Sequence, residues 1–223
     1  MSFRAEGEHL AIDLPGGTAL FTTRRGGRSE GAFTSLNLGL WTDDEPENVR
    51  ANRELVREQA GVERLVQGRQ VHGARVVVDA DGIEEADGQV TTAPGVAAIV
   101  LTADCLPVAL AGPDSVGMVH AGWRGLAAGV LEAGVAATGA IAAAIGPGIG
   151  PCCYEVGDEV RAVFGTSERT LDLKAVARER LRAAGVAQIH DCGLCTACDA
   201  ERFFSHRRDR GVTGRQAGLA WRS

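Results

Sequence analysis

Two histidines and one cysteine are the side chains of this sequence best suited to chemistry. His72, Cys105 and His120 each stand where an apolar run meets a turn signal. Two imidazoles and one thiolate make the ligand set of an open zinc site, which leaves the fourth position for water or substrate. The same side chains also suit a cysteine nucleophile with a histidine base. Each of them alone is more often a structural residue, and no two are close enough in sequence to form a local ligand motif.

Asp104 directly precedes the cysteine of this trio. A carboxylate at this position either orients a histidine ligand through a hydrogen bond or caps a turn. We take it as the candidate general acid or base.

Three arginines and one amide are candidates for substrate contact. Arg24 follows a predicted strand and precedes a glycine turn, and Arg207 and Arg208 are adjacent near the C-terminus. Arginine suits phosphate because its guanidinium donates two parallel, charge-assisted hydrogen bonds. Asn37 has apolar neighbours, so its amide is a candidate for contact with a ribose or a base. The alternatives are solvated surface arginines and a structural turn amide.

A second group of cysteines forms the pattern C-x-x-C-x-x-C. Its members are Cys192, Cys195 and Cys198, and such spacing is typical of zinc and iron–sulfur sites. A fourth ligand would come from His190 or from the pair 152–153. We otherwise interpret that cysteine pair as packing residues.

Buried strands are expected to position the reactive side chains. Short apolar runs predict such strands at 96–102, 107–111 and 116–120, so that Cys105 and His120 lie at strand ends. The segments 65–71 and 74–79 are expected to pair, with His72 at their junction.

The remaining elements indicate an α+β fold. Strands are expected at 9–14, 19–23, 141–145 and 216–221, and helices at 46–60, 126–138, 156–164 and 173–184. The elements mix without strict alternation, which favours a layered α+β sandwich over a doubly wound parallel sheet. The G-x-G-x-x-G dinucleotide fingerprint is absent after the first strand.

Composition and charge limit the class of protein to which this chain can belong. The 223 residues, 45% hydrophobic and 23% charged, predict a globular protein with one continuous domain, 1–223. A formal net charge of −6 argues against non-specific nucleic-acid binding. No signal peptide or membrane-spanning run is present, so we expect a cytoplasmic protein without membrane contact. Its six cysteines are then free thiols or ligands.

Several longer motifs indicate the family of the protein more specifically. The stretches RQVHGARVV, LTADCLPV, VHAGWRGLAAGVLE, IGPGIGPCCYEVGDEV and FFSHRRDRGVTGRQAG occur in this order. Together they resemble the bacterial multicopper polyphenol oxidoreductase, or laccase-domain, family over nearly the whole chain. This resemblance implies a four-layer α/β/β/α fold and a zinc ion bound by His72, Cys105 and His120. It further implies phosphorolysis of adenosine, inosine, guanosine and methylthioadenosine, and deamination of adenosine.

The resemblance also guides the assignment of individual residues. We predict that substrate is contacted by Asn37, Gln70, Trp123, Arg124 and Arg207. We predict catalytic roles for Asp104, Cys105, Arg24 and Arg208. The family pattern requires only Cys195 of the second cysteine group. It usually has tyrosine where this chain has His206, so the sequence departs from the pattern there.

Four classes of function remain distinguishable by experiment. A zinc purine-nucleoside enzyme predicts near-stoichiometric zinc, phosphate-dependent release of hypoxanthine from inosine, and loss of both in His72→Ala. A Cys-His hydrolase with Cys105 as nucleophile predicts inactivation by alkylation and activity that survives chelation. A binding or assembly module predicts zinc-dependent folding without turnover. A copper-dependent polyphenol oxidase is disfavoured, because five histidines in total are few for a multicopper cluster.

Overall fold

The computed structural model describes residues 2–223 and contains two six-stranded sheets. The first has the order β1-β2-β3-β12-β7-β4, and the second has the order β11-β10-β8-β9-β6-β5. Strand pairs are antiparallel except β4–β7, β5–β6 and β10–β11, which are parallel. Mixed sheets with separate helices confirm the predicted α+β class.

The strands of the first sheet are β1 (Arg4–Glu6), β2 (His9–Leu14), β3 (Gly17–Phe21), β4 (Arg64–Val66), β7 (Val96–Thr102) and β12 (Gln216–Arg222). Those of the second are β5 (Val76–Val78), β6 (Gly88–Thr91), β8 (Leu106–Ala111), β9 (Val116–Ala121), β10 (Ala142–Ile145) and β11 (Gln188–Asp191). The helices are α1 (Pro46–Ala60), α2 (Trp123–Ala128), α3 (Val130–Thr138), α4 (Asp158–Phe164) and α5 (Leu173–Ala183), with a short 3-10 helix at Gly31–Phe33.

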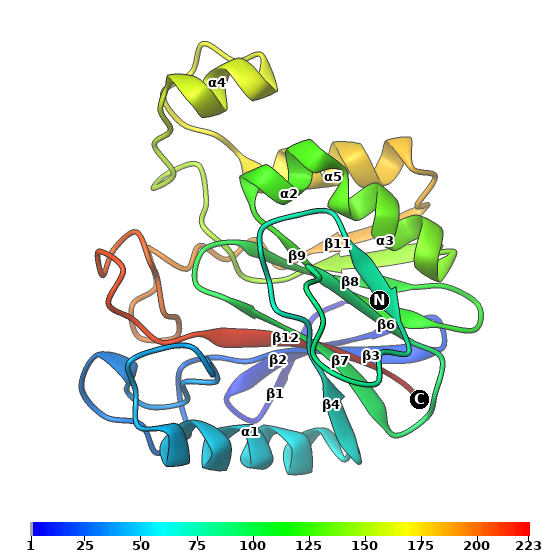
Figure 1. The fold of residues 1–223 in the computed structure, drawn as a ribbon. Helices are drawn as coiled ribbons and strands as arrows, with labels where there is room; N and C mark the ends of the chain where they lie inside the picture. Colours follow the sequence, from blue (N-terminus) through cyan, green and yellow to red (C-terminus); the bar gives the residue numbers. More distant parts are fainter. Residues whose placement is uncertain (1) are drawn as a thin grey trace.

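Figure 1 shows α1 along one face of the first sheet and α2, α3 and α5 along the far face of the second. The alternating pattern of β7 explains how the sheets are packed. Its residues Ala97, Ile99 and Leu101 belong to the apolar cluster that includes Val56 of α1. The intervening residues, such as Val100, face the cluster between the two sheets. A period of two residues thus buries both faces of a central strand.

Two expectations about local structure are wrong. The segments expected to pair around His72 belong to different sheets: Val66 is paired with Ala98, and Val76 is paired with Gly88. Residues 67–75 therefore cross from one sheet to the other. The helix expected at 126–138 is divided at Gly129, whose φ of 89° lies in the left-handed region that favours glycine.

Most other elements agree with the sequence patterns. Helix α1 ends at Ala60, and the left-handed conformation of the next residue, Gly61, lets its N–H donate to the carbonyls of Arg57 and Glu58. In the described part of the chain, none of the helices has the length and apolarity needed to span a bilayer.

Candidate functional site

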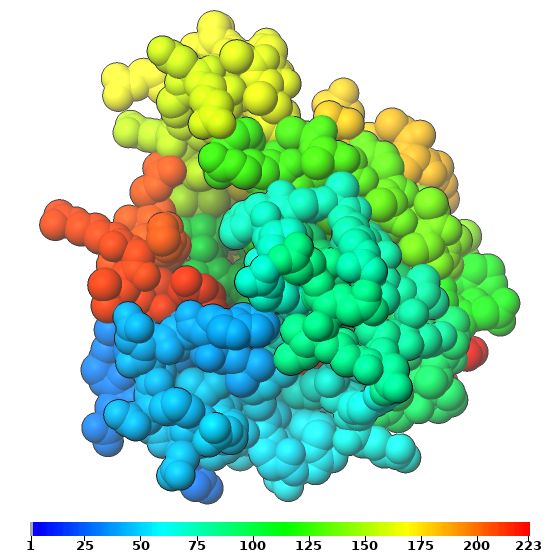
Figure 2. Space-filling model, in the orientation of Figure 1, coloured from blue at the N-terminus to red at the C-terminus, as the bar shows by residue number. Residues whose placement is uncertain are grey.

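A pocket of about 510 Å³ lies beside the ends of strands from both sheets. Figure 2 shows the surface hollowed where blue, cyan and orange-red segments meet, which are distant in the sequence. The lining comes from segments 39–42, 70–72, 101–105, 120–124, 149–154 and 206–215. A volume in this range accommodates a ligand the size of a nucleoside.

Antiparallel pairing of β8 and β9 brings the cysteine and one histidine together. The register pairs Pro107 with His120 and Leu106 with Ala121, so Cys105, one residue before β8, lies opposite the end of β9. Gly122 permits this approach, because a Cβ atom there would stand 2.8 Å from the cysteine Sγ atom. The predicted strand-end placement of Cys105 and His120 is confirmed.

Asp87, which the sequence analysis missed, organises both histidines. It directly precedes β6, the neighbour of β9, and its carbonyl accepts the N–H of His120 at 2.7 Å. Its carboxylate is fully buried and lies 2.7 Å from Nδ1 of His120. The same carboxylate accepts the backbone N–H groups of Val71, His72 and Gly73 at 3.1, 2.9 and 2.7 Å. The Asp87 side chain thus fixes the ring of His120 and the backbone segment that carries the ring of His72.

The three predicted ligands converge. The ligand atoms of His72, Cys105 and His120 lie within 4.8 Å of one another. The two imidazole centroids are 4.8 Å apart, with their planes at 78°. Because Asp87 engages Nδ1 of His120, Nε2 of that ring is left for a ligand, which is the carboxylate–histidine arrangement common at zinc sites. The donor set therefore fits one divalent ion of zinc type.

Without metal, the cysteine and His120 form a charged pair. Burial opposes the thiolate, but the charges and hydrogen bonds of His120 and His72 outweigh it and lower the pKa of Cys105 to about 6. Burial likewise opposes the imidazolium, while Cys105 and Asp87 raise the pKa of His120 to about 9. Burial opposes a charge on Asp87 too, yet hydrogen bonds from His120 and Gly73 lower its pKa.

This charged pair predicts how metal affinity varies with pH. Between pH 6 and 9 the metal displaces the His120 proton, so the logarithm of the affinity should rise by about one per pH unit. Below pH 6 the slope should steepen, because Cys105 also carries a proton. Zinc titrations at several pH values, with calorimetry in buffers of different ionisation enthalpy, measure this. An affinity independent of pH from 6 to 9 would contradict the charged pair.

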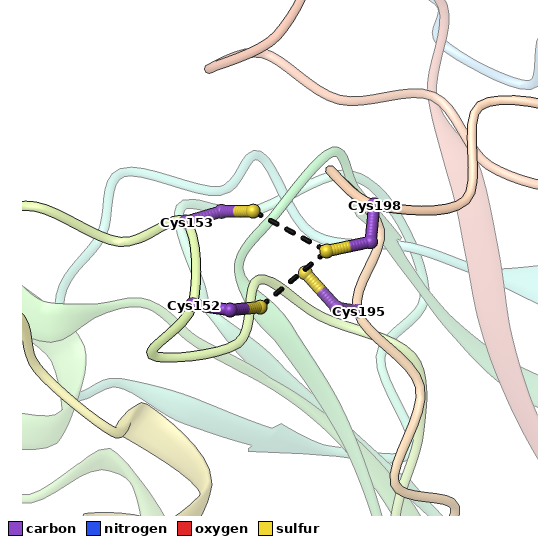
Figure 3. Close-up of side chains that lie close together, drawn as sticks. All are labelled: Cys152, Cys153, Cys195 and Cys198. Atoms are coloured by element: carbon purple, nitrogen blue, oxygen red, sulfur yellow. Dashed lines mark hydrogen bonds between the residues drawn. The ribbon is translucent and has the colours of Figure 1, made fainter.

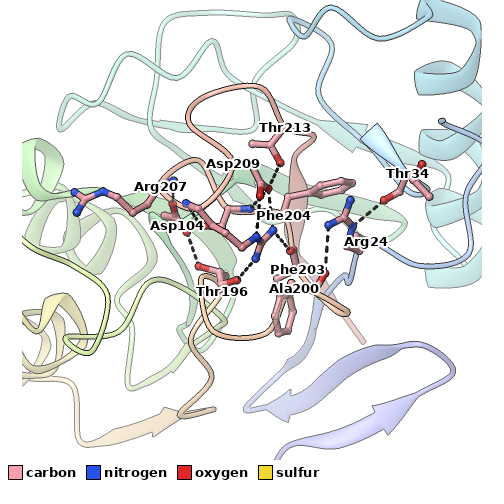
Figure 4. Close-up of polar contacts among 12 residues, drawn as sticks. Arg24, Thr34, Asp104, Thr196, Ala200, Phe203, Phe204, Arg207, Asp209 and Thr213 are labelled. Carbon is pink, nitrogen blue, oxygen red and sulfur yellow. Dashed lines mark hydrogen bonds and ion pairs between the residues drawn. The ribbon is translucent and has the colours of Figure 1, made fainter. Parts of the chain in front are cut away.

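Asp104 bonds to the C-terminal segment rather than to a histidine. Its carboxylate accepts the Thr196 hydroxyl at 2.7 Å and the Arg207 N–H at 2.7 Å (Figure 4). It is buried, with a φ of 95°. Of the two interpretations offered for Asp104, the histidine-orienting contact is made by Asp87 instead. Asp104 holds residues 196–207 against the strand end that bears Cys105.

Aromatic and cationic side chains complete the pocket lining. The Arg124 guanidinium lies 4.1 Å from the Trp123 ring centroid, and that of Arg207 lies 5.2 Å from the Tyr154 ring. Burial, followed by the Cys105 charge, raises the pKa of Tyr154 to about 12, so its hydroxyl keeps a proton to donate. Gln70 lines the pocket too, and its amide is bonded to both backbone groups of Leu101.

Three predicted site residues do not line this pocket. Arg24 donates to the carbonyls of Thr34 and Ala200 (Figure 4). Arg208 bonds to Asp209 and to the carbonyls of Thr196 and Phe203.

Asn37 is fully buried and holds a turn together. Its amide donates to Thr42 and Asp44 and accepts from the N–H groups of Gly39 and Arg215. The structure thus gives Arg24, Arg208 and Asn37 bonds within the protein.

The second cysteine group is rearranged relative to its sequence pattern. Cys195 and Cys198 lie with the pair Cys152–Cys153, which we interpreted as packing residues, whereas Cys192 is outside this group (Figure 3). The four Sγ atoms lie within 4.8 Å of one another. Among residues 2–223, this group and the His72 trio are the groups of three or more side chains placed to share a metal ion.

Comparisons with known proteins agree with the motif resemblance. The family model described as multi-copper polyphenol oxidoreductase laccase matches residues 18–223. A purine nucleoside phosphorylase of Pseudomonas aeruginosa is 41% identical over 91% of this chain and 92% of its own length. A purine nucleoside phosphorylase of Geobacillus stearothermophilus is 38% identical over 95% of this chain and 92% of its own.

Solved structures show the same fold. A hypothetical protein of Bacillus licheniformis superposes with a TM-score of 0.92 at 34% identity and covers 99% of both chains. A Neisseria meningitidis protein superposes with a TM-score of 0.90 at 38% identity and covers 97% of this chain and 99% of its own.

Proposed function

This chain belongs to the multi-copper polyphenol oxidoreductase laccase family, and we propose that it is a zinc-dependent purine nucleoside phosphorylase with adenosine deaminase activity. Its substrates would be adenosine, inosine, guanosine and methylthioadenosine. The observation that carries the proposal is the convergence of His72, Cys105 and His120 at a nucleoside-sized pocket with arginines in its wall. The curated relatives with this name support the choice of substrate. We also interpret the two sheets and their flanking helices as the four-layer sandwich, formed by residues 1–223 as one domain.

His72, Cys105 and His120 would hold the zinc ion. When bound, zinc would supply electrophilic stabilisation of developing negative charge and, for deamination, activation of water near neutral pH. One ion could then serve both reactions. Copper is a weaker choice, because the described residues bring only two histidines into a shared metal-binding group, and a multicopper cluster needs more imidazoles.

Phosphorolysis requires that a phosphate oxygen attack C1′ of the ribose while the purine leaves. Arg124, Arg207 and Arg215 line the pocket, and we assign phosphate binding to Arg124 and Arg207. The Trp123 and Tyr154 rings beside them offer apolar faces for the purine. The protonated Tyr154 hydroxyl is a candidate donor to the departing base. Asp104 would position the pocket wall through its bonds to the Thr196 hydroxyl and the Arg207 N–H, and Gln70 through its bonds to the Leu101 backbone. Holding both reactants in this way is a large part of such catalysis.

The activity is tested with inosine. The zinc-loaded protein should release hypoxanthine and ribose 1-phosphate only when phosphate is present, and it should release ammonia from adenosine. Release of hypoxanthine at the same rate without phosphate would make the protein a nucleosidase. No release from any purine nucleoside would refute the proposal.

The phosphate contacts make a separate prediction. Arg124→Ala and Arg207→Ala should each raise the KM for phosphate by about 10–100-fold, because each removes a charge-assisted hydrogen bond of about 1.5–3 kcal/mol. The KM for inosine should change much less. The control is Arg182→Ala, which removes an exposed arginine of α5. Unchanged phosphate KM values in both pocket variants would place the phosphate elsewhere.

A cysteine hydrolase is the second candidate. The Cys105 thiolate, the His120 imidazolium and the Asp87 carboxylate form a chain of the nucleophile–base–orienter type. This alternative predicts inactivation by iodoacetamide in the zinc-loaded protein, a covalent adduct on Cys105 during turnover, and full activity after chelation. The zinc proposal predicts none of these three results.

A further inference from the structure

Cys152, Cys153, Cys195 and Cys198 form a cluster that has no part in the proposed reaction. We propose that these four thiolates bind one structural zinc ion, which fastens a loop that lines the pocket to a second loop that is bonded to Asp104 in the pocket wall. The inference concerns a second metal site and does not depend on the proposed function.

The spacing of the sulfur atoms fits a single tetrahedral ion. Sγ of Cys198 lies 3.4 Å from that of Cys152 and 3.3 Å from that of Cys153, and all four lie within 4.8 Å of one another (Figure 3). Four sulfurs at about 2.3 Å from zinc stand about 3.8 Å apart. An iron–sulfur cluster is excluded on size, because its own iron and sulfide atoms stand between its cysteines and spread them more widely.

Convergence of the four sulfurs on one point favours a metal over disulfides. Cys198 approaches both Cys152 and Cys153, whereas disulfide formation sorts sulfurs into exclusive pairs. The Gly150 N–H also donates to Sγ of Cys195 at 3.2 Å. An N–H donor to sulfur stabilises a thiolate and is a common outer contact of metal-bound cysteine.

The two ligand-bearing loops are already aligned by the fold. They follow β10 and β11, which are parallel neighbours, and a bridge between Gly148 and Cys195 continues the pairing beyond the strands. The Thr196 N–H donates to the Gly148 carbonyl at 3.2 Å. Because the strands fix the approach of the loops, a metal ion needs little rearrangement to join them.

The same loops reach the pocket. Ile149 and Tyr154, on the first loop, line it. Thr196, between two of the cysteines, donates to Asp104, the residue before Cys105. Zinc at the four cysteines therefore supports the pocket without touching substrate.

Zinc content measured by mass spectrometry tests this inference. Wild-type protein, purified under reducing conditions and loaded with zinc, should hold about two ions per chain, and Cys152→Ser and Cys198→Ser should each hold about one. The control Cys192→Ser changes a neighbouring cysteine outside the cluster and should keep both ions. His72→Asn should lose one ion and retain the one at the cysteines.

Spectroscopy on His72→Asn, which keeps all four cysteines, gives a readout that does not depend on how the cysteine variants fold. In His72→Asn, cobalt in place of zinc should give the intense visible absorption of tetrahedral thiolate coordination, and zinc X-ray absorption should report four sulfur ligands. Wild-type protein whose single zinc ion is lost in His72→Asn and kept in Cys152→Ser overturns the inference. So do two disulfides found by mass spectrometry in protein prepared with reductant, or a zinc content unaffected by Cys152→Ser and Cys198→Ser. If the cysteines bind zinc and inosine is not cleaved, the proposed function fails and this inference stands.

Discussion

His72→Asn should remove one zinc ion per chain and lower kcat/KM for inosine phosphorolysis at least about 1,000-fold. Loss of electrophilic stabilisation worth several kcal/mol corresponds to a factor of this size. His72 has a φ of 60°, and asparagine tolerates this left-handed conformation better than alanine. The substitution therefore removes the ring without adding backbone strain. Zinc content and steady-state kinetics measure the two losses, and a thermal melt checks that the substitution adds no backbone strain.

The matched control is His190→Ala, which removes a histidine of β11 outside the metal-capable groups. It should keep both zinc content and activity. His72→Asn protein that is folded, lacks this zinc ion and still cleaves inosine at the wild-type rate would show that the trio does not serve the reaction.

Asp87→Asn is the second substitution with a large expected effect. The carboxylate accepts three backbone N–H groups and the Nδ1 side of His120. An amide offers one oxygen, and its own N–H groups would face donors. We expect zinc affinity to fall about 10–100-fold, as for other lost partners of zinc ligands, with a lower Tm because buried N–H groups lose their acceptor.

Asp104→Asn is a control of the same chemical type. Asp104 is also buried and adjacent to Cys105, but it is bonded to Thr196 and the Arg207 backbone. Its replacement should leave zinc affinity within about threefold of wild type, because it touches neither histidine ligand. A competition assay with a zinc chelator compares the two variants. Equal losses of affinity would assign the orienting role to both carboxylates.

Apolar runs were sufficient to predict the strands that place Cys105 and His120. Strands at Val96–Thr102 and Val116–Ala121 are continuous apolar runs, and helix α1 has its proline and glycine boundaries in the sequence. The placement of Cys105 and His120 at strand ends followed from these runs alone.

Contacts between distant segments were not predictable in this way. The chain around His72 was expected to form a hairpin, because two apolar runs follow each other closely there. Such runs look the same in sequence whether they pair with each other or belong to different sheets. Asp87 is one of 29 acidic residues and precedes the short strand Gly88–Thr91, which has no clear period. Its role depends on the pairing of β5, β6 and β9, which only the fold supplies. The prediction that His72, Cys105 and His120 converge likewise depended on the family motifs, because strand pairing between distant segments is not visible in the sequence.

The cysteine cluster illustrates the same limit. The pattern Cys192, Cys195, Cys198 suggested a local site. Parallel pairing of β10 with β11 instead brings the loop with Cys152 and Cys153 to the last two of these residues. Strand order, rather than ligand spacing, selects the members of the group.

The most direct test of the central claim is the rate of inosine phosphorolysis by protein stripped of metal and then titrated with zinc. We predict that the stripped protein releases no measurable hypoxanthine and that activity rises in proportion to zinc bound by His72, Cys105 and His120. The same titration of His72→Asn should restore none. Stripped protein that converts inosine and phosphate as fast as the zinc-loaded protein would contradict the account.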